Sequence, residues 1–397
     1  MSIERRQVVV VGAGPVGLLT ALGLARQGVH VTVLDAEADV IRSPRASVYF
    51  HTTLSVLSKL GLSDGAHAQG QISHLFTMHW PDSGERMQSD MRDALDPDQQ
   101  FDHNLHFGQD VLADMVIRHL ASHPGVELLW DHTVTALGQA DGTARVKAET
   151  EVGERVFEAD WVIGADGARS GIRSLLGLPF EGFTWPERFV AANISYPFGQ
   201  YGYSEANMVA DPVNWAVIAS LGKGDLWRVT FGEDAELPER KLADRLPERL
   251  AQILPDPGIA YEVHAFSPYR VHQRCAPRFR VGRVLLAGDA AHACNPCGGM
   301  GLTSGVIDAD VLSDALGAVI QGRAGEDLLD FYASERRRVF LDVAAPLSAH
   351  FKRLLAESDP VQREADKQAM FAGARKGGAE IRSSSLAERL RGTPLPL

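Results

Sequence analysis

The sequence is short of cysteine and has no long apolar run. Only three cysteines, Cys275, Cys294 and Cys297, occur in 397 residues, which excludes the disulfide framework of a small secreted domain. No stretch approaches the roughly 20 apolar residues of a membrane-spanning helix. Residues 1–7 are polar and are not typical of a secretory signal. We therefore expect a cytoplasmic protein without a membrane partner.

The sequence also has no excess of positive charge. Its net charge of −12 argues against nucleic acid as a partner, although a small anionic ligand needs only a local positive site. The hydrophobic share of 45% and the charged share of 23% are ordinary for a globular protein. The length predicts two or three domains.

One segment near the start has the pattern of a dinucleotide-binding unit. The β-branched run Val8 to Val11 predicts a buried strand. It is followed by Gly12, Gly14 and Gly17 in G-x-G-x-x-G spacing, by a helix predicted over residues 18–27, and by a strand over 29–34 that ends at Asp35. Such glycines let the backbone approach a pyrophosphate at a helix N-terminus, and the acidic residue accepts ribose hydroxyls. The pattern does not distinguish FAD from NAD.

Two further strand–turn–helix signals occur later in the chain. In the first, a strand over 161–163 precedes a turn with Asp166, and Ser170 is placed to cap the next helix. In the second, a strand over 283–287 precedes Gly288-Asp289, a glycine-rich loop and a helix that begins near Leu302. Each signal alone is generic.

Taken in order, these three segments resemble the motifs of the single-component (class A) FAD-dependent aromatic monooxygenases, the family built like para-hydroxybenzoate hydroxylase. The resemblance reaches to about Ala345 and rests on Gly12-Ala-Gly-Pro-Val-Gly17, Gly164-Ala-Asp-Gly-Ala-Arg-Ser-Gly-Ile-Arg173 and Gly288-Asp-Ala-Ala-His292. It implies an α/β fold with a Rossmann-like FAD-binding domain of the glutathione-reductase type, an inserted, mostly antiparallel substrate domain, and C-terminal helices.

The resemblance also implies which residues hold FAD. They are Gly12, Gly14, Pro15, Val16 and Gly17 at the pyrophosphate, Asp35 at the adenosine ribose, Arg45 and Gln109 at the phosphate–ribityl region, Asp166 near the approach of the nicotinamide, Asp289 at the ribityl chain, and Pro296, Gly301, Leu302 and Thr303 at the isoalloxazine. Thr303 stands where the family often has Asn. We therefore expect the backbone contacts to survive and the mobility of the flavin to differ.

The family's activity implies an NAD(P)H- and O2-dependent monooxygenase that hydroxylates an activated aromatic or heteroaromatic ring through a flavin C4a-hydroperoxide. A non-oxygenating reductase, oxidase or FAD-binding regulator stays open, because the motifs certify only FAD binding. A FAD-dependent halogenase is disfavoured, since no Trp-x-Trp-x-Ile-Pro segment occurs near Val213. The sequence does not decide between NADH and NADPH, between hydroxylation, ring opening and a Baeyer–Villiger step, or between monomer and homodimer.

The segment Cys294-Asn-Pro-Cys297 raises the question of a redox pair or a metal site. A zinc site needs two further ligands and no second such motif exists. A thioredoxin-type pair usually opens a helix, whereas these cysteines precede one. We predict no metal site and two small apolar side chains in the flavin loop, with Cys297 near substrate.

The substrate and its proton acceptor are less well marked. Candidate pocket residues are Val48, Tyr49, Phe50, Tyr201, Tyr203 and Cys297, and candidate bases are His51, Tyr203 and His272. The sequence does not select among these side chains, because a base is identified first by its geometry.

The predicted division of the chain is discontinuous. The FAD-binding domain comprises residues 1–71, 99–181 and 270–325, the substrate domain residues 72–98 and 182–269, and a helical segment residues 326–397. Within that segment we expect a helix over 330–355 that is kinked or broken near Pro346, with Arg336, Arg337 and Arg338 on a solvated face. The polar end of the sequence is too short for the additional domain that some relatives carry.

Overall fold

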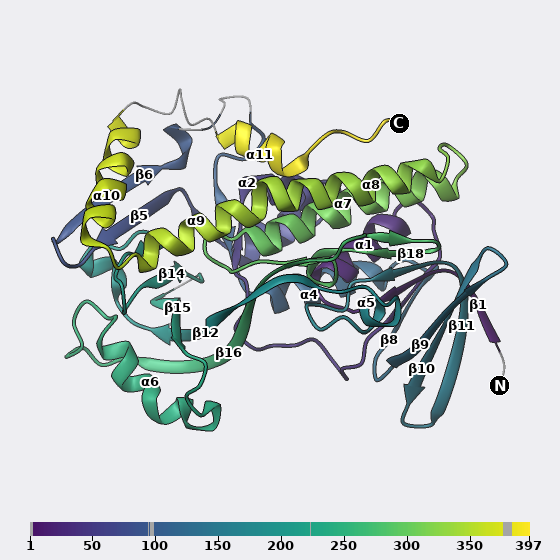
Figure 1. The fold of residues 1–397 in the computed structure, drawn as a ribbon, viewed down its shortest axis with the longest axis horizontal. Helices are drawn as coiled ribbons and strands as arrows, with labels where there is room; N and C mark the ends of the chain where they lie inside the picture. The colour runs from purple at the N-terminus through teal and green to yellow at the C-terminus, as the bar shows by residue number, and fades with distance from the viewer. Residues whose placement is uncertain (1–2, 94, 96–98, 223, 376–382) are drawn as a thin grey trace.

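The computed structural model describes residues 3–93, 95, 99–222, 224–375 and 383–397. Two large sheets lie side by side, and a layer of long helices runs across both of them (Figure 1). One sheet is mainly parallel and the other mainly antiparallel. This arrangement confirms the predicted α/β fold class. None of the described helices is both long and apolar enough to cross a membrane.

The first sheet is the core of the dinucleotide-binding half. Its strands follow the order β17-β18-β11-β1-β2-β8, with β9 and β10 extending β11 as an antiparallel arm. The bounds are β1 Ile3–Val11, β2 Val31–Leu34, β8 Val126–Leu129, β9 Thr133–Ala140, β10 Thr143–Thr150, β11 Gly153–Gly164, β17 Arg280–Val281 and β18 Val284–Leu286. Val8, Val9 and Val10 are completely buried, as expected for a parallel strand covered on both faces.

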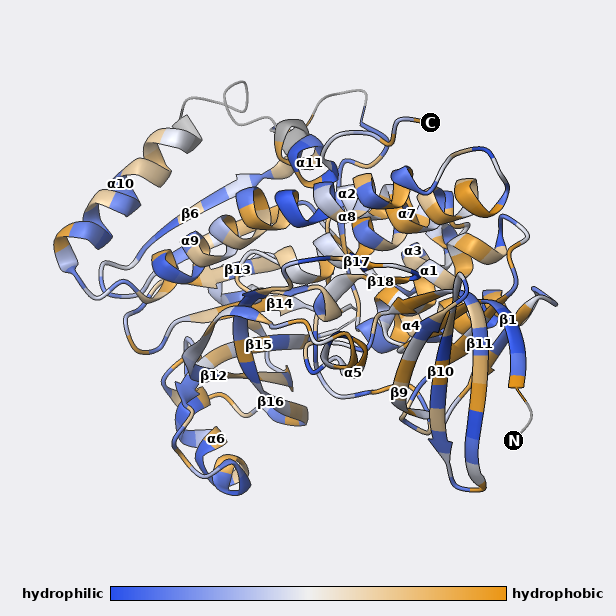
Figure 2. Ribbon diagram, turned by 45° about the vertical axis from the view of Figure 1, so that its right-hand side comes forward, coloured by the Kyte–Doolittle hydropathy of each residue, from blue (hydrophilic) through white to orange (hydrophobic). Residues whose placement is uncertain are grey.

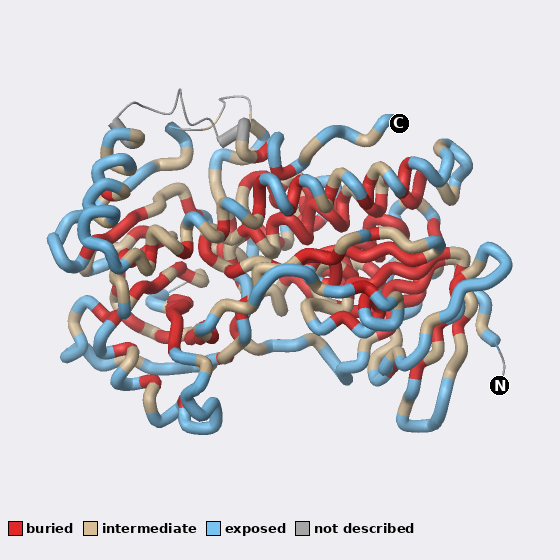
Figure 3. The backbone as a smooth tube through the Cα atoms, viewed as in Figure 1, coloured by how far each residue is buried: buried red, intermediate tan, exposed pale blue. Residues whose placement is uncertain are grey.

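Helices α1 (Pro15–Ala25), α4 (Gln109–Leu120), α7 (Met300–Ile320) and α8 (Asp327–Val339) cover this sheet, and the buried residues concentrate between them (Figure 3). α1 and α7 approach closely because α1 carries small residues at the contact. A Cβ atom on Gly23 would lie 2.4 Å from the Ser313 hydroxyl oxygen. This close packing places the N-termini of α1 and α7 over the same edge of the sheet.

Most of the second sheet comes from the predicted substrate domain, whereas its residues 270–275 and 292–293 come from a segment assigned to the FAD-binding domain. Its strands follow the order β19-β16-β12-β15-β14-β13-β5-β6, with bounds β5 Leu75–Trp80, β6 Glu85–Asp90, β12 Glu181–Ser195, β13 Ala206–Val209, β14 Ala216–Ser220, β15 Leu226–Asp234, β16 Glu262–Cys275 and β19 His292–Ala293. The strands β5 and β6 come from residues 72–98, so the sheet joins both segments assigned to the substrate domain. β19 follows the third motif directly and therefore ties this sheet to the flavin loop.

The two faces of the second sheet have different partners. The amphipathic helix α6 (Leu242–Ala251) presents Leu242, Leu246 and Leu250 to one face, where they pack against side chains such as Val190 and Val229; its polar side faces outward (Figure 2). The other face packs against the flavin loop and α9 (Ala345–Ala356). Any substrate held between sheet and flavin loop must lie on this second face.

A small third sheet joins the two halves. It consists of β3 (Val48–Tyr49), β7 (Asn104–His106) and β4 (Gln71–Ser73), and the helices α2 (His51–Lys59) and α3 (Ser63–Gln69) connect its strands. Tyr49 stacks on Phe107 with ring centroids 4.1 Å apart.

The helix predicted over 330–355 is continuous but changes its winding. α8 leads into a π-helical turn over Phe340–Ala344 and then into α9. Pro346 has no N–H to donate to the preceding turn, which explains the wider winding here. The sequence predicted the position of this irregularity correctly. α10 (Pro360–Arg375) and α11 (Ser383–Arg391) complete the chain.

Candidate active site

The glycine turn before α1 has the shape of a phosphate cradle. Gly12 has φ +107°, and a Cβ atom on Gly17 would lie 1.9 Å from the Gly12 carbonyl oxygen, so the fold itself needs both glycines. Gly14 is different: its φ is −72°, and a Cβ atom there would meet nothing within 4 Å. No side chain caps α1 at Gly14. The free helix N-terminus and the open space at Gly14 fit the FAD pyrophosphate.

Asp35 lies directly beside this turn, at the end of β2. Its carboxylate accepts a hydrogen bond from the Ala13 N–H and another, 2.9 Å long, from the Glu37 N–H. The side chain remains partly exposed. A carboxylate offers about four acceptor positions, so Asp35 retains capacity for a ribose hydroxyl, which stays a prediction.

Asp289, in the third motif, is accessible to solvent. The surrounding protein raises the pKa of its carboxyl, and His292 and Arg45 oppose this effect. Arg45 is exposed, and Gln109, at the first turn of α4, is half-buried. These positions are compatible with the predicted phosphate–ribityl contacts.

The second motif is connected to the third by Arg173, the last residue of the second motif. Asp166 accepts hydrogen bonds from the Ser170 hydroxyl and, at 3.0 Å, from the Ile172 N–H, and burial raises its pKa. Its protein contacts therefore lie within its own turn. Ser170 caps α5 (Gly171–Leu175) as predicted. The guanidinium of Arg173 spans the two motifs, with a 2.8 Å hydrogen bond to the Ala290 carbonyl.

The third motif brings the N-terminus of α7 close to the domain boundary. Gly298 and Gly299 both have positive φ. A Cβ atom on Gly299 would lie 2.6 Å from the Phe50 ring, and one on Gly301 would meet only the Cys294 sulfur, at 3.9 Å. The Gly299 N–H donates to the Pro296 carbonyl. The backbone at Gly301 and Leu302 thus keeps room for a ligand at this helix terminus.

Thr303 does not act as a cap of α7. It is buried, and its hydroxyl donates a 2.8 Å hydrogen bond to the Gly299 carbonyl one turn back. The Thr303 side chain is therefore turned along its own helix. The contact predicted here at the isoalloxazine rests on backbone atoms and stays a prediction.

A buried ionic network lies beneath the third motif. Asp308 on α7 accepts hydrogen bonds from His292 Nε2 at 2.6 Å, from Arg336 Nε at 2.7 Å and from the Gly288 N–H at 3.0 Å. Burial alone would raise the Asp308 pKa, but His292 and Arg336 hold it at about 2. The expectation that Arg336 lies on a solvated face was wrong, because it is 2% exposed. The helical period turns it inward while Arg338 faces outward.

The two cysteines of the third motif do not form a reactive pair. Both are free thiols, and burial raises the pKa of each to about 12, whereas a reactive thiol needs a lowered pKa. Cys297 is fully buried and packs with residues of the second sheet. The structure therefore supports the interpretation of Cys294 and Cys297 as packing residues.

The candidate pocket residues fall into two groups. Phe50 lies at the flavin loop, Val48 is half-buried beside it, and Cys297 joins the sheet face that the loop covers. Tyr49 points the other way, into the core around Phe107.

Tyr201 and Tyr203 lie on the opposite face of the second sheet, in the cluster that α6 covers. Tyr203 stacks on His79 at 4.1 Å, and burial raises its pKa to about 12. Tyr201 and Tyr203 are therefore separated by the sheet from the flavin loop.

The two candidate histidine bases, His272 and His51, have different surroundings. His272 hydrogen-bonds to the Thr184 hydroxyl at 2.9 Å, and burial together with nearby arginines lowers its pKa. It alternates along β16 with Val271, which faces the flavin loop. His51 is 8% exposed, and among the described residues neither ring nitrogen has a hydrogen-bond partner. Burial lowers its pKa to about 4, so the ring is neutral at neutral pH.

The sequence did not indicate two residues on the face of the second sheet that packs against the flavin loop. Arg228 alternates along β15 with Trp227 and Val229, which face α6. Its Nε donates to Asn193 Oδ1 at 2.9 Å and its Nη1 donates to the Arg45 carbonyl. Burial lowers the Arg228 pKa to about 10, so it remains a cation. Tyr269 lies in the same cluster as Cys297. No motif marks either residue; only the strand period could have indicated their face.

This chain is similar to known flavoproteins over most of its length. A family model described as "FAD binding domain" matches residues 5–345. Para-nitrophenol 4-monooxygenase of Pseudomonas sp. (strain WBC-3) is 44% identical over 388 residues, or 97% of this chain and 96% of that protein. The 6-hydroxy-3-succinoylpyridine 3-monooxygenase HspB of Pseudomonas putida (strain DSM 28022 / S16) is 41% identical over 369 residues, or 92% and 93%.

Solved structures show the same similarity in three dimensions. The crystal structure of p-nitrophenol 4-monooxygenase PnpA from Pseudomonas putida DLL-E4 superposes with a TM-score of 0.92 at 42% identity and covers 99% of this chain and 100% of that one. Aklavinone-11 hydroxylase, solved with FAD and aklavinone, gives a TM-score of 0.78 at 26% identity and covers 90% of this chain and 70% of that one.

Proposed function

The chain belongs to the FAD binding domain family and is a flavin-dependent aromatic monooxygenase, and we propose that its substrate is a single-ring phenol or hydroxypyridine with a displaceable substituent para to the hydroxyl. The match along 97% of the chain to a named aromatic monooxygenase, with the Gly14 cradle intact, is the observation that carries this proposal. The reductase, oxidase and halogenase alternatives are not favoured.

The position of oxygenation follows from the names of two relatives. Para-nitrophenol 4-monooxygenase is named for the ring carbon that carries the nitro group. In 6-hydroxy-3-succinoylpyridine, carbon 3 carries the succinoyl group and lies para to the hydroxyl-bearing carbon 6. Both names therefore indicate oxygenation at a substituted carbon para to a hydroxyl. We propose the same regiochemistry here, because both relatives share more than 40% of their residues with this chain.

The proposed FAD site consists of the cradle at Gly14, the ribose acceptor Asp35, the accessible side chains of Arg45, Gln109 and Asp289, and the backbone at the start of α7. When bound, FAD supplies the redox chemistry: electrons from NAD(P)H are used to activate O2. The α7 N-terminus would place positive partial charge beside the pyrimidine edge of the ring. Arg173, Asp308 and Arg336 hold the second and third motifs in place from behind.

The protein's own residues would orient and activate the phenol. We propose that the ring lies between the flavin loop and the face of the second sheet that carries Tyr269 and Arg228. The Arg228 cation would stabilise the charge of a phenolate, since buried charge is strongly stabilised by a nearby opposite charge. His51 would accept a hydrogen bond from the substrate hydroxyl at Nε2 or Nδ1, neither of which has a partner among the described residues. A buried, neutral imidazole without a partner is costly for the fold, which supports a functional role.

The net charge of −12 supports a free small molecule, and not nucleic acid, as partner. We also propose a monomer or homodimer that acts in the cytoplasm, and NADH or NADPH as the electron donor.

The test is nitrite release from para-nitrophenol by the purified holoenzyme with NAD(P)H and O2. Oxygenation at the nitro-bearing carbon gives one nitrite and one quinone for each NAD(P)H consumed. The isomeric product 4-nitrocatechol without nitrite would retain the monooxygenase assignment and refute the proposed regiochemistry. A parallel assay with hydroxypyridines substituted para to the hydroxyl covers the second substrate class.

A further inference from the structure

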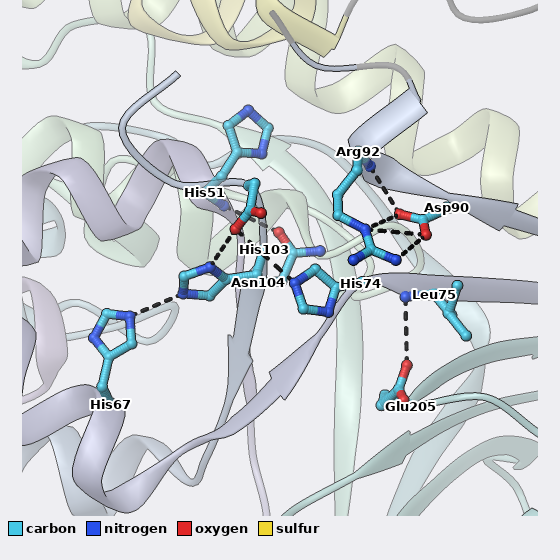
Figure 4. Close-up of polar contacts among 10 residues, drawn as sticks. His51, His67, His74, Leu75, Asp90, Arg92, His103, Asn104 and Glu205 are labelled. Atoms are coloured by element: carbon cyan, nitrogen blue, oxygen red, sulfur yellow. Dashed lines mark hydrogen bonds and ion pairs between the residues drawn. The ribbon is translucent and has the colours of Figure 1, made fainter. Parts of the chain in front are cut away.

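A cluster of histidines lies at the small third sheet, outside the proposed FAD site. His67 comes from α3, His74 from the link between β4 and β5, and Asp102 and His103 from the segment before β7. Figure 4 shows His103 with His67 on one side and His74 on the other. His103 Nδ1 lies 2.9 Å from Asp102 Oδ1, and His74 Nε2 lies 3.9 Å from the same oxygen. One ligand atom from each of His74, Asp102 and His103 falls within 4.8 Å of the others.

The hydrogen bonds of the cluster determine which nitrogen of His103 faces the carboxylate. His67 Nδ1 lies 2.7 Å from the Ser63 carbonyl, which only accepts, so Nδ1 of His67 carries a proton. In a neutral ring its Nε2 is then an acceptor for the Nε2–H of His103, 2.8 Å away. This leaves Nδ1 of His103 directed at Asp102. Nδ1 of His103 and a carboxylate oxygen of Asp102 therefore face the same space, which a metal ion can occupy.

The chemistry of these atoms matches a transition metal. Two imidazole nitrogens and one carboxylate oxygen form a ligand set used for Zn²⁺ and Fe²⁺. Ligand atoms about 2.0–2.1 Å from tetrahedral zinc lie roughly 3.3 Å apart, between the 2.9 and 3.9 Å found here. His67 would orient the ligating His103 through its second nitrogen, as is usual for metal-bound histidines.

The surroundings permit a cation to enter. The side chain of Asp102 is 63% exposed and that of His74 is 31% exposed, whereas that of His103 is 13% exposed. The nearby cation Arg92 is paired with Asp90 through several hydrogen bonds, which offsets its charge. An ion from solvent could therefore reach the carboxylate and keep water in its remaining positions.

We propose that His74, Asp102 and His103 form a binding site for a divalent transition-metal ion, with Zn²⁺ as the probe ion. The site joins the connection after α3 to the segment before β7. Asn104, the first residue of β7, accepts a 3.0 Å hydrogen bond from the His51 N–H. Bound metal therefore stabilises the small sheet that begins the wall of the active site, and it raises the unfolding temperature by mass action.

The experiment is a Zn²⁺ titration of tag-free holoenzyme by calorimetry, together with metal analysis after equilibrium dialysis. We expect one ion per chain. The single variants His74→Asn, Asp102→Asn and His103→Asn should each weaken binding by at least about tenfold, as should the orienting variant His67→Asn. His264→Asn is the matched control, because His264 is another partly exposed histidine and pairs only with Ser195 and Glu262 among the described residues.

A second readout uses Co²⁺, whose visible absorption bands report nitrogen and oxygen coordination. The bands should be present in the parent protein and in His264→Asn, and absent in Asp102→Asn. Asp102 is exposed and the change is isosteric, so the flavin absorbance of this variant should show an intact fold. Failure of the parent protein to bind either ion, or unchanged affinity in any one of the three ligand variants, overturns the site.

Discussion

The buried carboxylate of Asp308 is the most consequential single group behind the flavin site. It receives hydrogen bonds from His292, Arg336 and the Gly288 backbone, and it is completely buried. Replacing it by Asn keeps the shape and removes the charge, which leaves the Arg336 guanidinium buried without a counter-ion. Removing one partner of a buried ion pair typically costs about 3–5 kcal/mol. We therefore expect Asp308→Asn to lower the free energy of unfolding by that amount and to weaken FAD retention.

The pH dependence gives the effect a second signature. The Asp308 pKa is about 2 in the folded state, against about 3.9 in an unfolded chain. Because the folded value is lowered, the stabilisation of roughly 2–3 kcal/mol is complete above about pH 4 and disappears as the pH falls from about 4 to 2. The difference in stability between the parent protein and Asp308→Asn should shrink over this window.

The assay is urea unfolding at several pH values, followed by flavin fluorescence and circular dichroism. Asp314→Asn is the control, because Asp314 lies on the same helix and pairs with Lys59 at a more exposed position. The double variant Asp308→Asn, Arg336→Met should be less destabilised than the sum of the single changes, since the unpaired charge is gone. Equal stability of Asp308→Asn, Asp314→Asn and the parent protein would refute the reasoning.

Three further predictions concern the site itself. Gly14→Val should leave the unfolding temperature of the FAD-free protein unchanged, because the fold leaves space at this position. The same change should raise the FAD dissociation constant strongly, because the valine side chain enters the phosphate space. Gly17→Ala should instead impair folding, since its Cβ would lie 1.9 Å from a backbone oxygen. Soluble yield reports the folding effect of Gly17→Ala, and flavin titration reports the binding effect of Gly14→Val. A Gly14→Val protein with normal FAD affinity would contradict the assignment of Gly14 to the phosphate cradle. Cys297→Ser should lower the free energy of unfolding by about 1–3 kcal/mol, because it places a hydroxyl in an apolar cluster. Thermal melts measure this loss, and NAD(P)H turnover should show a nearly unchanged kcat. Loss of turnover in a folded variant would instead support a redox role for Cys297. His51→Asn should lower kcat/KM most for phenols that are un-ionised at the assay pH, whereas Tyr203→Phe should have the parent profile of kcat/KM against pH; the reverse pattern would exchange their roles.

The sequence predicted those parts of the molecule that depend on local pattern. The glycine spacing before α1, the Ser170 cap and the irregular winding near Pro346 all follow from interactions within a few residues. These are the cases in which backbone geometry requires a particular residue type at a particular offset. The fold class was predicted through the family resemblance that the flavin motifs carry.

The parts that escaped prediction depend on contacts between distant segments. Asp308 and Arg336 are 28 residues apart and meet only because α7 and α8 pack antiparallel. Tyr203 lies outside any strand, so no period could assign it to the face that α6 covers. His74 and His103 come together through the pairing of β4 with β7, and the expectation of no metal site rested only on cysteine spacing.

The measurement that tests the central claim most directly is isotope labelling with ¹⁸O2. Holoenzyme, NAD(P)H and a para-substituted phenol are mixed under labelled oxygen, and the product is reduced and analysed by mass spectrometry. We predict one ¹⁸O atom in the product, at the carbon that carried the substituent, for each NAD(P)H oxidised. Consumption of NAD(P)H and O2 with only labelled hydrogen peroxide, and no label in any product across the phenol and hydroxypyridine panel, would contradict the account.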